Sequence, residues 1–169
     1  MLEMNVIIGA IFGAIIGSFL NVVIYRLPLG KSISRPRSHC PSCGHVLSPL
    51  ELIPILSFIW QRAKCKSCKI NISWRYPAVE LLTAVLFMGV VYRYGFSSQS
   101  LIYLVFTALL IALAIIDLDC RRLPNALTGA IAVLALVQWI SGTVGFNSEA
   151  LSLKGAMWGA GIGALPLIV

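Results

Sequence analysis

The motifs CPSC at Cys40–Cys43 and CKSC at Cys65–Cys68, with 21 residues between them, organise the polar part of this sequence. Each C-x2-C motif turns its two thiols to one side of a tight turn, so two motifs can supply four ligands to one tetrahedral ion. A zinc ion with four thiolate ligands is a dianionic centre. Its negative charge would be offset by three nearby lysines, Lys64, Lys66 and Lys69. We therefore predict a structural zinc site with the ligands Cys40, Cys43, Cys65 and Cys68. The alternatives are two disulfides or four free thiols.

Outside these motifs the composition is that of a membrane protein. Hydrophobic residues make up 59% of the 169 residues, charged residues make up only 11%, and the mean hydropathy is +0.91. In soluble domains charged residues supply about a quarter of the chain. The sequence therefore predicts an all-α polytopic membrane protein with a small cytoplasmic insertion that resembles a zinc ribbon.

The basic residues are concentrated in one segment. Residues 26–75 hold nine of the 13 Lys and Arg residues and a single acid, Glu51. Basic charge in a loop between apolar spans is the positive-inside signal, which predicts that this loop is cytoplasmic. Because the cytosol keeps thiols reduced, this location favours zinc over disulfides. The net charge of +7 then reflects membrane topology, and we expect no nucleic-acid partner.

The apolar spans predict five membrane helices and an N-terminus on the outer side of the membrane. The spans lie at about 4–25, 77–92, 101–116, 126–140 and from 155 onward. The last span is still apolar at Val169, so we expect the chain to be part of a longer protein. Gly9, Gly13 and Gly17 recur every four residues and predict a face on which another helix packs closely. Asn21 lies one turn further along that face and is predicted to point into the bundle.

Residues 27–75 are predicted to fold as a small domain around the metal, because so short a segment has only a marginal core of its own. They separate the first span, in residues 1–26, from the other four, in residues 76–169. Within them, Leu50–Trp60 is apolar but only about 11 residues long, which is too short to cross a bilayer. We predict a helix that lies at the membrane interface or re-enters the membrane, with Trp60 at headgroup depth.

Two aspartates mark the end of the third span. Asp117 ends an apolar run, and an ionised carboxylate at membrane depth is costly unless a partner, water or a proton relieves it. Asp117 is therefore interpreted as a functional acid in a cleft, where Pro124 breaks the helix just beyond it. The alternative is that Asp117 and Asp119 only mark the water boundary and form ion pairs with Arg121 and Arg122.

Two further side chains allow a functional or a structural interpretation. Glu80, in the first turn of the predicted second span, is either a carboxylate favoured by the helix dipole or a functional acid that faces the bundle. Cys120 lies at a different helix end from the other four cysteines, and we expect it to be a small apolar residue with no part in the metal site.

A series of motifs runs in a fixed order along nearly the whole chain. They are GSFLNVVIYRLP at Gly17–Pro28, the two cysteine pairs, ELIP at Glu51–Pro54 with LSF at Leu56–Phe58, RYP at Arg75–Pro77 with Glu80 and Leu81, and Asp117 seven residues before Pro124. In this order they resemble the bacterial type IV prepilin peptidases. The resemblance implies a multi-pass inner-membrane aspartic protease that lies in the lipid bilayer with a periplasmic N-terminus. It would cut the basic leader from prepilins or pseudopilins at the cytoplasmic membrane face. The resemblance also implies methylation of the new N-terminus with S-adenosylmethionine.

Carried over by position, Asp117 would be the first of two catalytic aspartates. The family's second aspartate lies in a G-x-G-D motif, which this sequence lacks, since the GAGIG stretch at Gly159–Gly163 contains no acid. One carboxylate cannot both activate water and polarise the carbonyl, so this chain alone is expected to be inactive as a peptidase. Asp119, Asn125 and Glu80 are weaker candidates for supporting roles. The rival interpretations are a non-catalytic membrane zinc-ribbon module and a methyltransferase without peptidase activity.

Overall fold

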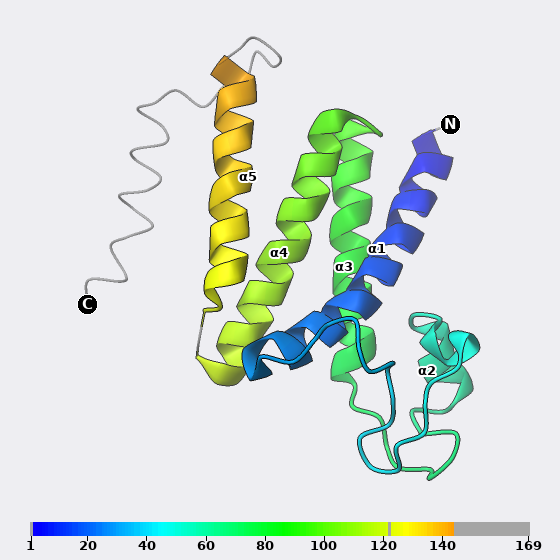
Figure 1. Ribbon diagram of the computed structural model, residues 1–169. Coiled ribbons are helices and arrows are strands. Elements are labelled where there is room, and N and C mark those ends of the chain that lie inside the picture. The colour runs from blue at the N-terminus through cyan, green and yellow to red at the C-terminus, as the bar shows by residue number, and fades with distance from the viewer. Residues whose placement is uncertain (1, 122, 144–169) are drawn as a thin grey trace. The chain divides into compact units, whose positions relative to one another are not determined.

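The computed structural model describes residues 2–121 and 123–143 (Figure 1). Its helices are α1 (Leu2–Arg26), α2 (Leu56–Trp60), α3 (Arg75–Tyr94), α4 (Ser98–Cys120) and α5 (Asn125–Thr143), with two 3-10 turns, η1 (Leu27–Leu29) and η2 (Pro49–Leu52). These described residues form no strand, only the isolated bridges His39–Val46 and Lys64–Asn71. The predicted all-α class is confirmed for this part of the chain. The predicted fifth span, from residue 155, lies outside it.

Within residues 2–121 and 123–143, three helical stretches are long and apolar enough to cross a membrane: Glu3–Leu29, Arg75–Tyr94 and Ser98–Cys120. They match the first three predicted spans, although α4 continues past residue 116 and includes both aspartates. The apolar part of α5, Asn125–Trp139, is shorter, so the fourth span stays a prediction.

The glycine ridge of α1 packs directly against α3, as the sequence predicts. A Cβ atom added to Gly17 would lie 2.7 Å from the Cα of Glu80, and one added to Gly13 would lie 2.8 Å from the Cα of Ala84. At Gly9 a Cβ would meet a side chain of α3 at a similar distance. Because real Cβ atoms do not approach other atoms so closely, only glycine allows the two backbones to lie at this separation.

The core of the bundle lies between α1, α3 and α4 in one compact unit that comprises residues 1–128. Its main buried cluster consists of Leu20, Ile24, Val79, Ile111, Ala112, Ile116 and Leu127. Asn21 is buried beside this cluster, and its Nδ2 donates a hydrogen bond to the Tyr76 carbonyl oxygen at 3.1 Å. The predicted inward orientation of Asn21 is thus confirmed. Its bond fixes the end of α1 to the start of α3.

Residues 27–75, here called the insertion, lie at the end of the bundle where α1 and α4 finish and α3 begins (Figure 1). The predicted helix over Leu50–Trp60 is wrong in one respect, because the stretch is broken into η2 and α2. Pro54 lacks an N–H group and disfavours a helical residue before it. The chain instead makes a γ-turn, in which the Leu56 N–H donates to the Pro54 carbonyl at 2.5 Å.

Candidate functional site

The first cysteine motif forms a closed loop stabilised by two backbone hydrogen bonds. The Cys40 N–H donates to the His45 carbonyl, and the Gly44 N–H donates to the Cys40 carbonyl, each at 2.9 Å. Gly44 has a φ of 71°, in the left-handed region that glycine adopts without steric cost. This turn presents the sulfurs of Cys40 and Cys43 on the same side.

The second cysteine motif has the same two backbone hydrogen bonds as the first. The Cys65 N–H donates to the Ile70 carbonyl at 2.9 Å, and the Lys69 N–H donates to the Cys65 carbonyl at 3.0 Å. Lys69 occupies the position of Gly44 and has a φ of 60°, which is unfavourable for a residue with a Cβ. The two loops therefore have the same backbone design, although only one carries the glycine that this design prefers.

The four sulfurs of these loops converge on one point. All lie within 4.8 Å of one another, with 3.9 Å between Cys40 and Cys68 and 3.9 Å between Cys43 and Cys65. Sulfurs bound to one zinc ion at about 2.3 Å would be about 3.8 Å apart, whereas a disulfide joins its sulfurs at about 2.0 Å. The structure therefore has no disulfide among its described cysteines, and the fifth, Cys120, is exposed at the end of α4. The donor set and the spacing fit a zinc ion.

Backbone N–H groups favour the thiolate form of Cys40, whereas at Cys43 the effect of the His45 N–H is outweighed by desolvation and the neighbouring cysteine thiols, which raise the pKa of that thiol to about 11. The N–H groups of Cys43 and Ser42 point at the Cys40 sulfur and lower the pKa of that thiol to about 6. Metal binding to cysteine releases protons, so a thiol that ionises near neutral pH loses less free energy in forming the site.

A carboxylate next to the first loop fixes it to η2. Glu51 Oε2 accepts hydrogen bonds from the Ser48 N–H at 2.9 Å and the Ser48 hydroxyl at 2.7 Å, and it lies 3.2 Å from His45 Nε2. The Ser48 N–H and hydroxyl, with His45, lower the pKa of Glu51 to about 2. This carboxylate connects the loop residue His45 to the start of η2, a contact that the sequence did not predict.

Glu80 connects the insertion to the helix bundle. Its Oε2 accepts a hydrogen bond from the Ile55 N–H at 2.7 Å. Ile55 is the central residue of the γ-turn, with φ 60° and ψ −51°, a rare and strained backbone conformation for a β-branched residue. Since α3 begins at Arg75, Glu80 lies in the second turn, and the predicted first-turn position favoured by the dipole is wrong.

The two aspartates at the end of α4 differ in their surroundings. Asp119 forms an ion pair with Arg75, the first residue of α3, and not with Arg121. Asp117 is exposed in the last turn, and only its backbone carbonyl is bonded, by the Arg121 N–H at 2.8 Å. Within the described chain the Asp117 carboxylate forms no ion pair and no side-chain hydrogen bond.

The predicted site residues form separate groups at one end of the bundle. The cysteines form the metal group, Glu80 lies between insertion and bundle, and Asp117 and Asp119 lie at the end of α4. Asn125 is exposed as the first residue of α5. Arg75 was not among the predicted site residues, and only its position in the RYP motif could have indicated it.

Comparisons with known proteins identify two family regions in the chain. Residues 11–94 match the bacterial peptidase A24 N-terminal domain, and residues 104–169 match the type IV leader peptidase family. No solved structure was found to match the chain.

Curated relatives carry one recurrent name, prepilin leader peptidase/N-methyltransferase. The protein of that name from Myxococcus xanthus (strain DK1622) is 45% identical over 157 residues, which cover 92% of this chain and 44% of the relative. The Bacillus subtilis (strain 168) protein is 44% identical over 143 residues, 80% of this chain and 58% of the relative. The Neisseria gonorrhoeae protein is 37% identical over 176 residues, 90% of this chain and 61% of the relative. The chain thus spans about half the length of the relatives it matches.

Proposed function

Since the chain belongs to the type IV leader peptidase family, we propose that the whole protein removes the leader from prepilins or pseudopilins. The observation that carries the proposal is that both family regions occur in order along one chain. The exposed carboxylate of Asp117 adds support, because it lies at the same end of the bundle as the insertion. Neither the non-catalytic zinc-ribbon module nor the methyltransferase-only remnant explains relatives named as peptidases.

The proposed reaction is aspartic proteolysis with Asp117 as one of two carboxylates. Such a pair shares one proton, so that one carboxylate activates water while the other polarises the scissile carbonyl. Asp119 and Glu80 are poorly suited to be the second member, because Asp119 is paired with Arg75 and Glu80 accepts from Ile55. We expect the second carboxylate to come from the region of the relatives that this chain does not span.

The proposed location is the inner membrane, with the N-terminus periplasmic and the insertion cytoplasmic. The basic charge of residues 26–75 supports this orientation by the positive-inside rule. Asp117 would then meet its substrate at the cytoplasmic face, where the leader of a membrane-embedded prepilin emerges from the bilayer.

We further propose that Cys40, Cys43, Cys65 and Cys68 hold one structural zinc ion. The ion would join the two cysteine loops, which is how metal sites stabilise small domains. Elemental analysis of the purified chain is expected to give one zinc per chain, and Cys43→Ser is expected to lower that ratio. A metal-free preparation with an intact insertion would refute the assignment.

A second activity, methylation of the new N-terminus, is proposed from the double name of the relatives. S-adenosylmethionine would be the methyl donor, and we assign none of the described residues to it. A full-length parent protein, incubated with a processed pilin and the methyl-labelled donor, is expected to transfer the label to the pilin N-terminus. A pilin that stays unlabelled while the same preparation still cleaves prepilin would refute this second activity.

The test of the peptidase proposal compares single substitutions in a full-length parent protein. Asp117→Asn is expected to abolish leader cleavage of a prepilin in detergent, measured as a size shift on a gel. Asp119→Asn is the matched control, two residues away, and should retain cleavage because it removes only an exposed ion pair. The 169-residue chain itself should not cleave, since losing one member of a catalytic unit costs nearly as much as losing all of it. Cleavage by Asp117→Asn at the parent's rate would refute the assignment.

A further inference from the structure

The insertion exposes a group of large apolar side chains, here called the α2 patch: Leu50, Leu56, Ile59, Trp60 and Trp74. Trp60 and Trp74 are 73% and 75% exposed, far more than aromatic residues of a folded domain usually are. The patch residues come from neighbouring segments, because η2 packs on α2 and the Trp74 ring lies against Phe58 of α2 with 4.8 Å between ring centroids. A cluster of this kind marks a surface that another molecule covers.

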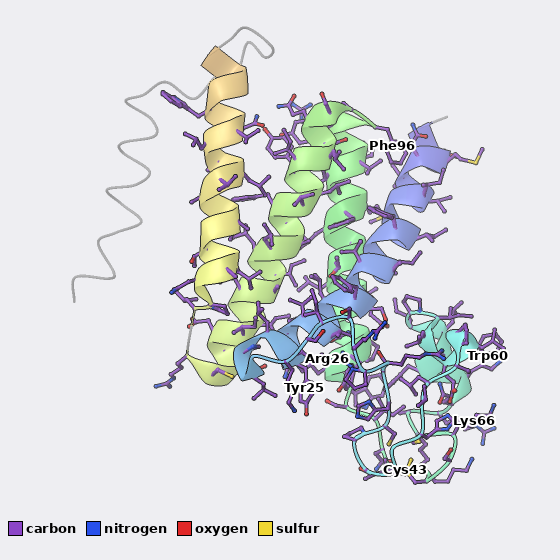
Figure 2. All side chains as sticks on the ribbon, in the orientation of Figure 1. Tyr25, Arg26, Cys43, Trp60, Lys66 and Phe96 are labelled. Atoms are coloured by element: carbon purple, nitrogen blue, oxygen red, sulfur yellow. The ribbon has the colours of Figure 1, made fainter. Side chains whose placement is uncertain are left out.

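The γ-turn at Ile55 holds the start of α2 beside α3, near the end of the bundle at which α3 begins. Glu80, in the second turn of a candidate membrane span, holds Ile55, and α2 starts at the next residue. Figure 2 shows Trp60 level with the lower part of the helices and directed away from them, whereas Cys43 lies beyond the helix ends. Lipid headgroups would surround the bundle at the level of Trp60.

The charge that follows α2 along the chain is basic, whereas the acid beside Leu50, Glu51, is engaged by Ser48 and His45. Four cations follow α2 along the chain, Arg62, Lys64, Lys66 and Lys69, and no acid occurs between residues 61 and 75. Figure 2 shows Lys66 on the same outer side as Trp60. Each Lys or Arg near an anionic membrane surface contributes about 1 kcal/mol, and Trp is the side chain preferred at headgroup depth.

We propose that the α2 patch is an interfacial anchor that docks the insertion onto the surface of a bilayer containing anionic phospholipids. The aromatic and aliphatic side chains enter the headgroup region, and the lysines bind lipid phosphates. A second copy of this chain is a poor occupant, because it would bring like charge against the same lysines. Docking of this kind does not depend on peptidase activity, since it depends on the exposure, position and charge of the insertion.

The experiment measures where Trp60 lies, using the chain in lipid nanodiscs. The chain has four tryptophans, and replacement of Trp74, Trp139 and Trp158 by Phe leaves Trp60 as the only indole emitter. In discs that contain phosphatidylglycerol, lipids brominated near the headgroup end of the acyl chain are expected to reduce Trp60 fluorescence at least twofold. Acrylamide in the buffer should quench it weakly.

Two outcomes overturn the proposal. Strong acrylamide quenching without bromolipid quenching would place Trp60 in water, and protection from both quenchers would mean that protein covers the patch. The same protection would be the result if an acidic peptide or a second copy were the true occupant.

The contribution of the basic residues to binding anionic lipid is tested by substituting two lysines. Lys64→Gln with Lys66→Gln should weaken bromolipid quenching in phosphatidylglycerol discs and leave it unchanged in discs of phosphatidylcholine alone. Arg93→Gln, at the opposite end of α3, is the matched control and should have no effect. Equal quenching in both lipids for the unsubstituted chain would refute the anionic preference. Limited proteolysis of residues 27–75 verifies that each variant is folded.

Discussion

Arg75 Nη2 and Asp119 Oδ2 form an ion pair that joins the first residue of α3 to the last turn of α4, 44 residues further along the chain. The pair links the start of α3 to the end of α4, and these two helix ends lie at the same end of the bundle (Figure 1). Of the two aspartates in the last turn of α4, the ion pair engages Asp119 and not Asp117.

The ion pair should contribute only modestly to stability. Both side chains are more than a third exposed, and exposed pairs contribute about 0.2–1 kcal/mol. A double-mutant cycle with Arg75→Gln and Asp119→Asn, measured by unfolding in detergent, is expected to give a coupling energy in that range. It should shrink at high salt, and a coupling energy of zero at low salt would contradict the observed pair.

Gly17→Ala should destabilise the packing of α1 on α3. The new methyl group would meet the Glu80 backbone at 2.7 Å, and overpacking of this kind costs about 1–3 kcal/mol. Gly89→Ala is the control, because a Cβ at Gly89 meets nothing within 4 Å and alanine favours the helix. Thermal unfolding in detergent should separate the two variants, and equal melting temperatures would argue against close packing at Gly17.

Glu80→Leu should release the insertion from the bundle. It leaves the Ile55 N–H without its acceptor, and an unsatisfied buried donor costs about 1–3 kcal/mol. Glu80→Gln retains an acceptor oxygen and should have a smaller effect. Limited proteolysis near residues 53–56 is expected to be fastest in the leucine variant. Identical digestion of all three proteins would show that the bond does not hold the turn.

The equivalent turn positions Gly44 and Lys69 should respond in opposite directions. Lys69→Gly removes a side chain from a left-handed position and should stabilise the loop by about 1 kcal/mol. Gly44→Ala should destabilise its loop by a similar amount, although the added Cβ has open space around it. Metal competition against a chelator should show changes of about fivefold in opposite senses. Changes of the same sign would refute the equivalence of the two loops.

The contribution of Glu51 should depend on pH. Its pKa is lowered to about 2 in the folded protein, compared with about 4.3 in an unfolded chain. Because the folded value is the lower one, the stabilisation is complete above about pH 5 and is lost as pH falls toward 2. The difference in unfolding free energy between the parent and Glu51→Gln should therefore shrink between about pH 6 and pH 3. A difference that stays constant with pH would contradict the lowered pKa of Glu51. Any effect of pH on metal binding occurs in both proteins and therefore cancels in the difference.

Local sequence patterns predicted the features of this fold that depend on spacing. The four-residue period of Gly9, Gly13 and Gly17 defines a helix face, and the C-x2-C motifs define a ligand set. The break at Ile55 was missed, although Pro54 within the apolar run indicates it. The bonds of Glu80 to Ile55 and of Asp119 to Arg75 join residues far apart in sequence. Contacts of this kind produce no periodic pattern in the sequence, so they could not be predicted from it. Roles of Asp117 and Asn125 in catalysis stay predictions.

The repeated bond pattern of the two cysteine loops bears on the order in which the chain is made. Every contact that defines these loops joins residues between 38 and 72, so the loops have all their partners before α3 leaves the ribosome. The acceptor for Ile55 and the partner of Arg75 are synthesised later, on α3 and α4. The two loops can therefore form before α3 and α4, which hold the insertion in place, have been synthesised.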